Sequence, residues 1–130
     1  MPHLYFDYNA AVAERCDMAA FAETMRQTIP TAGPFPVAGV RVRGFQANVA
    51  AIADSGAHGY LHMQFRIGAG RDLETRRSAA DALYAAAEAW LAPRIGALPF
   101  ALSLEIFELP GDGTSLKRFN TIRDHLAEKG

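Results

Sequence analysis

The chain has 130 residues, half of them hydrophobic, so it is long enough for one domain with a buried core and short for two. Its 13 Lys and Arg residues nearly balance 14 Asp and Glu residues, and the net charge of -1 gives no reason to expect nucleic acid or an acidic membrane as a partner. The single cysteine excludes an internal disulfide and favours a reducing compartment, and no apolar run reaches the roughly 20 residues of a membrane span. We therefore expect a cytoplasmic protein with a single domain, residues 1–130.

The first third of the chain has the pattern of a strand, a helix and a second strand. Residues 3–8 alternate as a strand with aromatic side chains on both faces, which predicts an inner strand of a sheet. After a connection over residues 9–16, Asp17 can cap an amphipathic helix that Pro30 ends. Residues 40–45 alternate strictly and predict the second strand.

A second unit with the same pattern follows. Residues 46–59 carry turn signals and predict a connection with room for a short hairpin. Residues 60–67 alternate as a third strand, and Asp72 can cap the longest helix of the chain. Residues 100–109 predict a fourth strand, and residues 115–128 predict a short polar tail helix with apolar side chains that can dock.

This order predicts two internal repeats, at about residues 2–46 and 59–109. Right-handed crossovers in both units give an α+β fold: a four-stranded mixed sheet with two helices on one face, plus the short C-terminal helix. Apolar and aromatic residues occur on both sides of the first and fourth strands, yet the chain supplies no second helical layer. We therefore expect other subunits to cover the second face of the sheet.

The N-terminus offers a candidate general base. Removal of Met1 would leave Pro2 as the N-terminal residue, and α-amino groups titrate at about 7.7 to 8.0 in reference peptides. A prolyl amine held at the end of a strand has no side-chain flexibility and can serve as a base near neutral pH. The alternative is that Pro2 only permits removal of the methionine and carries no chemistry.

Three arginines are candidate ligands for an anion. Arg41 and Arg43 lie two apart on one strand, so they leave the same face and suit the capture of carboxylates; alternatively they form a charged edge that discourages aggregation. Arg71 follows a glycine loop at the start of the longest helix, where free amide donors and the helix dipole favour anions. Those glycines are equally compatible with a simple turn, because the rest of a nucleotide-binding motif is missing.

The other polar residues predict no second site. The four histidines lack the paired spacing of metal ligands, so no metal is expected. His62 is expected to be a hydrogen-bonded core residue. Glu105 can be buried near an arginine, but it does not share a strand face with Glu108, so the two do not form an acid and base pair.

Several segments along the chain match the pattern of one known family. They are MPH at residues 1–3, FPVAGVRVR at 35–43, HM at 62–63 with IGAGRDLE at 67–74, LSLEI at 102–106, and KRFNTIRDHL at 117–126. Together they span nearly the whole chain, and they resemble the 5-carboxymethyl-2-hydroxymuconate Δ-isomerases. The resemblance implies the tautomerase superfamily fold, a duplicated strand-helix-strand unit assembled as a trimer.

The resemblance also implies a mechanism without a cofactor. The family substrate is an unsaturated tricarboxylate from the ring-cleavage pathway for homoprotocatechuate, and the N-terminal proline, here Pro2, would move a proton from the 2-hydroxyl of the dienol to C5. Arg41 and Arg71, the latter expected from a neighbouring subunit, would hold carboxylates and stabilise the dienolate, with Arg43 assisting. Two alternatives remain open, a tautomerase of another 2-oxo acid and a non-catalytic binding protein on the same scaffold.

Overall fold

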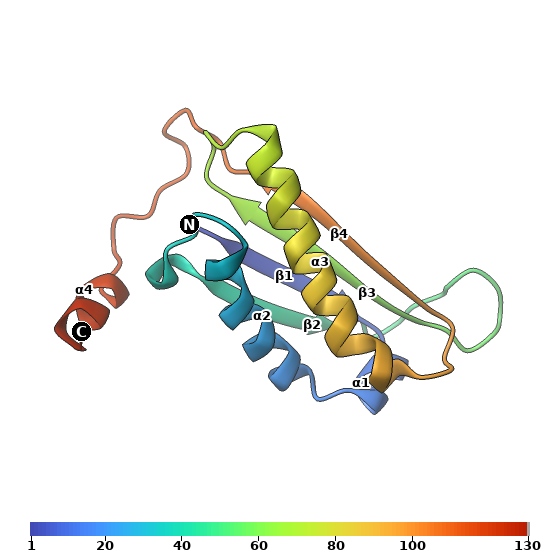
Figure 1. Cartoon of the computed structure of the whole chain (residues 1–130). Helices are drawn as coiled ribbons and strands as arrows, with labels where there is room; N and C mark the ends of the chain where they lie inside the picture. The colour runs from blue at the N-terminus through green and yellow to red at the C-terminus, as the bar shows by residue number, and fades with distance from the viewer. Residues whose placement is uncertain (130) are drawn as a thin grey trace.

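Four strands form one mixed sheet, and the two longest helices cover one of its faces (Figure 1). The computed structural model describes residues 1–129. The strands are β1 (His3–Tyr8), β2 (Arg41–Gln46), β3 (Gly59–Ile67) and β4 (Phe100–Glu108), in the order β2-β1-β3-β4 across the sheet. Within each strand-helix-strand unit the two strands are parallel, and β1 runs antiparallel to β3 where the units meet. The predicted fold class is confirmed, and β1 is an inner strand as expected.

The two covering helices begin at the predicted caps. These helices are α2 (Met18–Ala32) and α3 (Leu73–Ile95). The carboxylate of Asp17 accepts the Ala20 N–H at 3.1 Å, and that of Asp72 accepts the Thr75 N–H at 2.8 Å. Each acidic cap satisfies a donor that the first helical turn leaves free. The shorter elements are α1 (Ala10–Arg15), the 3₁₀ turn η1 (Val37–Gly39) and α4 (Ile122–Lys129).

The core lies between the helices and the covered face of the sheet. Alternate residues of β1 and β3 point into it and are almost completely buried: Leu4, Phe6, Leu61, Met63, Phe65 and Ile67. The helices contribute residues at helical spacing, and the Phe21 ring of α2 lies 5.3 Å from the Trp90 ring of α3. The strict alternation in β3 predicted its buried face correctly.

Two predicted boundaries are wrong. The expected connection over residues 9–16 contains helix α1, and Pro30, which was expected to end its helix, lies inside α2, as Pro93 lies inside the last turn of α3. A proline in the last turn removes one hydrogen bond. Burial of the residues beyond it, Ala32 and Ile95, keeps the last turn helical.

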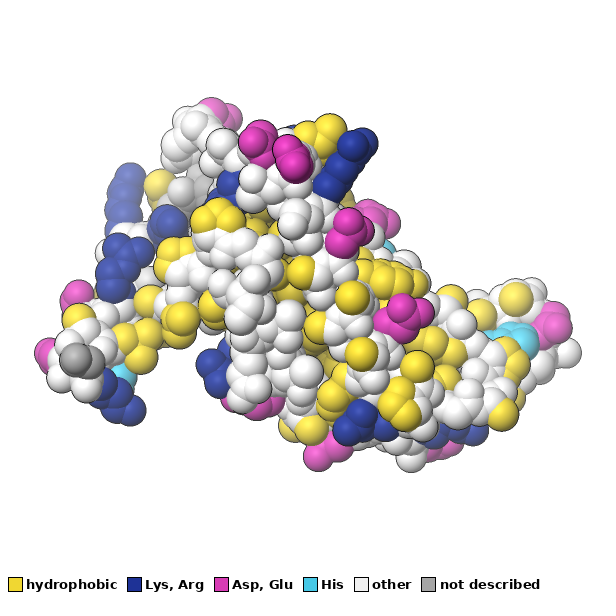
Figure 2. Space-filling model, viewed as in Figure 1, with side chains coloured by type: hydrophobic (Ala, Val, Ile, Leu, Met, Phe, Trp, Pro, Cys, Tyr) yellow, Lys and Arg dark blue, Asp and Glu magenta, His cyan; other side chains and the backbone are white. Residues whose placement is uncertain are grey.

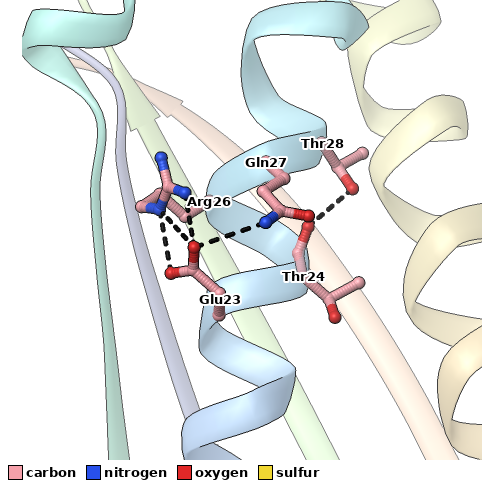
Figure 3. Close-up of polar contacts among 5 residues, drawn as sticks. All are labelled: Glu23, Thr24, Arg26, Gln27 and Thr28. Carbon is pink, nitrogen blue, oxygen red and sulfur yellow. Dashed lines mark hydrogen bonds and ion pairs between the residues drawn. The ribbon is translucent and has the colours of Figure 1, made fainter.

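The outer face of α2 is hydrated and polar (Figure 3). Glu23 accepts hydrogen bonds from Arg26 one turn along the helix, and Gln27 donates to the same carboxylate. Thr28 donates its hydroxyl to the Thr24 carbonyl. Exposed pairs of this kind contribute little to stability, so the helix is held by its buried stripe.

The C-terminal segment leaves the body of the molecule after β4 and ends in α4, which lies against η1 (Figure 1). The predicted tail helix over residues 115–128 is wrong in its first half, because α4 begins only at Ile122. Its apolar side chains do not dock within the chain: Leu116, Phe119, Ile122 and Leu126 are exposed. No helix within residues 1–129 has the length and apolar character needed to cross a membrane.

The second face of the sheet carries no helix, and its residues alternate with those of the core. The register brings side chains from all four strands together there: Arg41, Arg43 and Phe45 of β2, His3, Tyr5 and Asp7 of β1, His62, Gln64 and Arg66 of β3, and Ser103, Glu105 and Phe107 of β4. Phe45 and Phe107 are exposed large hydrophobic residues on this face. No helix or strand formed by residues 1–129 covers this face.

Candidate active site

Pro2 is buried just before β1, at the end of the sheet where η1 and the loop after β3 also lie. Its carbonyl accepts the Arg41 N–H at 3.1 Å, which joins it to the first residue of β2. A methyl group added at Gly39 would lie 3.1 Å from the Pro2 Cδ, so a side chain there would push the proline ring away from η1 by a few tenths of an ångström. The ring position is therefore fixed from two sides.

Arg41 stands beside Pro2 on the open face of the sheet. Its Cα is paired with that of His3 in the β1–β2 register, and its Nη1 donates to the Gly39 carbonyl at 2.9 Å. This contact holds the guanidinium next to η1. Arg41 also lines a cavity together with Met1, His3 and Gly68.

Arg71 closes the site from the loop before α3. It donates to the Gly68 carbonyl at 3.2 Å and to the Pro34 carbonyl at 3.0 Å, and its guanidinium lies 4.8 Å from the centre of the Phe35 ring. It therefore joins the two loops that flank the chain start. The charge of Arg71 lowers the pKa of the Met1 amine of its own chain. That a neighbouring subunit supplies the Arg71 of each site stays a prediction.

Arg43 lies apart from the other two arginines. Two residues further along β2, its guanidinium lies 4.2 Å from the centre of the Tyr5 ring, and it borders neither of the two cavities at the chain start. Arg71 also borders neither cavity, but its charge, like that of Arg41, lowers the pKa of the Met1 amine, whereas the charge of Arg43 lowers the pKa of His3. Arg41 and Arg71 therefore lie near the chain start, and Arg43 lies on the open face.

Two cavities of about 270 and 410 Å³ flank the chain start. Met1, Lys117 and Asn120 line both of them, while Pro2 lines the smaller cavity and Arg41 the larger. Dark blue Lys and Arg side chains gather on this side of the molecule, where the C-terminal segment lies (Figure 2). The site is thus built from the starts of β1 and β2, the loop after β3 and the C-terminal segment.

Sequence reasoning gave Lys117 no role, although it lies in the KRFNTIRDHL segment that carried the family resemblance. A lysine in an exposed, polar tail has no periodic pattern that marks it as part of a site. Its place depends on how the segment folds back past Pro2, which only the tertiary structure shows.

The site disfavours a protonated amine. The pKa of the Met1 amine is lowered from 8.0 first by burial and then by the positive charges of Lys117, Arg71 and Arg41. The nitrogen of Pro2 is one residue further into the same site, so an amine at that position is subject to the same cations.

His3 is a second residue of the site that sequence reasoning missed. It lines the larger cavity, and its Nδ1 is buried without a hydrogen-bond partner among residues 1–129. Burial is the first cause that lowers its pKa, followed by the charges of Arg43 and Arg41. The imidazole is therefore neutral at pH 7 and presents an uncharged nitrogen beside the cations.

The other predicted polar residues lie away from this site. His62 is not a core residue: it stands on the open face, where its Nδ1 contacts the Ser103 hydroxyl at 2.6 Å. Glu105 is exposed, and its oxygen lies 3.9 Å from His62 Nε2 rather than beside an arginine. No group of three or more His, Cys, Asp and Glu side chains in residues 1–129 is arranged to hold a metal ion.

The fold and the site define an α+β protein with a tautomerase-like fold and a proline beside a cationic cavity at the chain start. A family model described as 5-carboxymethyl-2-hydroxymuconate isomerase matches residues 2–126. The chain therefore belongs to the 5-carboxymethyl-2-hydroxymuconate isomerase family. The resemblance seen in the sequence and the prediction of an isomerase are confirmed.

Individual relatives agree with this assignment. The chain is 34% identical over 111 residues to a 5-carboxymethyl-2-hydroxymuconate Delta-isomerase of Escherichia coli, a match that covers 84% of this chain and 87% of the relative. A crystal structure of a 5-carboxymethyl-2-hydroxymuconate delta-isomerase has a TM-score of 0.87 at 27% identity and covers 97% and 93% of the two chains. The isomerase from Deinococcus radiodurans R1 has a TM-score of 0.83 at 30% identity and covers 96% and 93%.

A more distant likeness concerns the fold alone. The W0 fused 4-OT wild type symmetric trimer has a TM-score of 0.64 at 10% identity and covers 93% of this chain and 98% of that chain.

Proposed function

We propose that this protein isomerises 5-carboxymethyl-2-hydroxymuconate in the breakdown of homoprotocatechuate, with the amine of Pro2 as the base once Met1 is removed. The observation that carries the proposal is the buried Pro2 at a cavity edge, with Arg41, Arg71 and Lys117 around the chain start. The substrate follows from the names of the family and its relatives. Its muconate chain and its carboxymethyl group carry three carboxylates, which these cations complement.

The reaction needs one proton to move and no cofactor. The neutral amine takes the proton of the 2-hydroxyl, and the oxygen electron pair forms the C2 carbonyl. The C2–C3 double bond moves to C3–C4, and the electron pair of the C4–C5 double bond takes the proton from the ammonium at C5, which gives the 2-oxo-3-ene and restores the base. Arg41 binds a carboxylate from the larger cavity and stabilises the negative charge on the dienolate oxygen. In this proposal Arg43 only strengthens the positive field on the open face.

Arg71 has a double role in this proposal. Its charge stabilises the dienolate, and its hydrogen bonds to Gly68 and Pro34 hold the two loops beside Pro2. Positioning of this kind matters because small displacements of a reacting group cost large factors in rate.

We further propose that the protein acts as a trimer. The open face of the sheet exposes Phe45 and Phe107, and the C-terminal segment exposes Leu116 and Phe119. Burial of these surfaces against other copies would stabilise the assembly. The fold neighbour that is a symmetric trimer supports the same arrangement.

The function is tested by following the ultraviolet absorbance of the dienol tricarboxylate while it converts to the enone, together with the intact mass of the protein. We expect conversion, and a mass that lacks Met1. An alanine inserted between Met1 and Pro2 turns the Pro2 nitrogen into an amide and should reduce kcat by at least about 100-fold, the contribution typical of a general base. Pro2→Ala is the matched control, because it keeps an amine at the chain start and should retain part of the activity. An insertion variant as active as the wild type would exclude Pro2 as the base.

The same assay separates the two alternatives. A tautomerase of another 2-oxo acid would convert a smaller dienol but not the tricarboxylate. A binding protein would convert neither.

A further inference from the structure

Lys117 is placed in the site by a segment that otherwise packs poorly. Residues 110–129 contain no buried side chain, and only Asn120 among them is half-buried. Even so, the segment passes the chain start closely enough for Lys117 and Asn120 to line both cavities. The part of the C-terminal segment that meets the rest of the chain is therefore the part that borders the site.

The ammonium of Lys117 has no acidic partner among residues 1–129, and it lies within hydrogen-bond reach of the Met1 amine. Of residues 1–129, no Asp or Glu forms an ion pair with it, and Asp124, which lines the smaller cavity, does not contact its ammonium within ion-pair distance. The arginines differ, because Arg41 donates to Gly39 and Arg71 donates to two backbone carbonyls. Among the Lys and Arg residues that line the two cavities, Lys117 borders both, whereas Arg118 and Arg123 border only the smaller one and Arg41 only the larger one.

The chemistry of the substrate distinguishes its three carboxylates. Two are attached directly to the conjugated dienol chain and share its plane, whereas the third is attached through a CH₂ group and can rotate. A planar guanidinium suits a carboxylate of fixed orientation, and an ammonium on a flexible stem accepts an anion from many directions. Lys117 therefore fits the rotating carboxylate better than it fits the other two.

We infer that Lys117 is the residue that recognises the carboxymethyl carboxylate and so sets the preference for the tricarboxylate over a dicarboxylate of the same chain. The inference rests on the proposed function for the identity of the substrate. It makes the C-terminal segment the specificity element of the site, while the reaction itself is carried by the strand starts and the loop after β3.

The kinetic test compares two substrates, 5-carboxymethyl-2-hydroxymuconate and the 2-hydroxymuconate that lacks the carboxymethyl group. Lys117→Gln should lower kcat/KM for the tricarboxylate at least about tenfold more than for the dicarboxylate, in line with a lost charge-assisted hydrogen bond. Lys117→Arg keeps the charge and should keep most of the wild-type preference for the tricarboxylate over the dicarboxylate. Arg77→Gln removes the same unit charge from the exposed side of α3 and should leave kcat/KM unchanged for both substrates. Equal losses for both substrates in Lys117→Gln would overturn the inference.

A binding experiment answers the same question without turnover. Hexanedioate and its 2-carboxymethyl derivative are saturated and cannot tautomerise, and calorimetry gives their Kd with each variant. We expect Lys117→Gln to raise the Kd of the tricarboxylate at least about tenfold and to raise the Kd of the dicarboxylate much less. If the wild type does not convert the tricarboxylate but Lys117→Gln weakens only the binding of the tricarboxylate ligand, the proposed function is wrong and the inference about Lys117 holds. If the wild type is active but Lys117→Gln weakens the binding of both ligands equally, the proposed function holds and the inference is wrong.

Discussion

At the scale of single residues, the chain start shows how a modest set of contacts can prepare an amine for proton transfer. Pro2 is buried against Gly39, and the charges of Arg41, Arg71 and Lys117 lower the pKa of the Met1 amine beside it. Each of these contributions disfavours an ammonium ion, and none of them requires a metal ligand or a catalytic carboxylate. In the proposed mechanism the reaction depends on the protonation of this single amine, so its pH dependence is the most direct readout.

The first prediction concerns that pH dependence. A basic group with a lowered pKa stays neutral to lower pH, so activity is lost only when the pH falls through the lowered pKa. The acid limb of kcat/KM should therefore lie below the ordinary amine value of 8.0. Arg41→Gln removes one cation and should move the limb to higher pH. The pH profiles of kcat/KM for the wild type and for Arg41→Gln measure this shift. An acid limb at the same pH in both proteins would show that Arg41 does not act on the base.

The second prediction separates the charge of Arg71 from its hydrogen bonds. Arg71→Ala loses both, and kcat/KM should fall at least about tenfold, or roughly 1.4 kcal/mol. Thermal unfolding should also start at a lower temperature, because the bridge between Gly68 and Pro34 is lost.

Arg71→Lys is the control for this pair of roles, since it keeps the charge but cannot reach both carbonyls with a planar fork. If charge dominates, the lysine variant stays close to the wild type in rate while its Tm still falls. Unchanged turnover and KM in Arg71→Ala would remove Arg71 from the site.

At the scale of elements, alternation and capping residues predicted the sheet and the two long helices. The sequence of β3 alternates without a break, and the aspartates before α2 and α3 are strong N-terminal signals. Helix α1 was missed because its six residues are too few to show a period. Pro30 gave the wrong end for α2, because burial of the residues beyond a proline depends on the packing partner and not on the local sequence.

The third prediction tests the packing between β1 and β2. Gly44 faces Phe6 in the register, and a methyl group at Gly44 would lie 2.4 Å from the Phe6 ring. Gly44→Ala should therefore destabilise the fold by about 1–3 kcal/mol, the cost of overpacking. In a Phe6→Leu background the same change should cost less, because the smaller side chain leaves room. Denaturant unfolding of the four proteins measures the difference, and strictly additive costs would show that the clash is relieved elsewhere.

At the scale of the whole molecule, the site was only partly foreseeable. Pro2, Arg41 and Arg71 come from segments with distinctive local patterns, and the structure brings them together. Lys117 comes from a tail whose position is set by tertiary contacts, so no local pattern marked it. The division into repeats 2–46 and 59–109 stays a prediction, although each unit contributes one parallel strand pair.

The last prediction concerns the proposed trimer. The open face of the sheet holds Phe107, and a carboxylate placed there would be buried without a partner if another copy covers it. Phe107→Asp should therefore shift the protein from three times the 14.1 kDa chain mass towards a single chain in light scattering. Ala85→Asp places the same charge on the exposed side of α3, on the other face of the molecule, and should leave the mass unchanged. A Phe107→Asp protein that remains trimeric would mean that subunits meet elsewhere, and the exposed apolar residues of the C-terminal segment would then be the next surface to test.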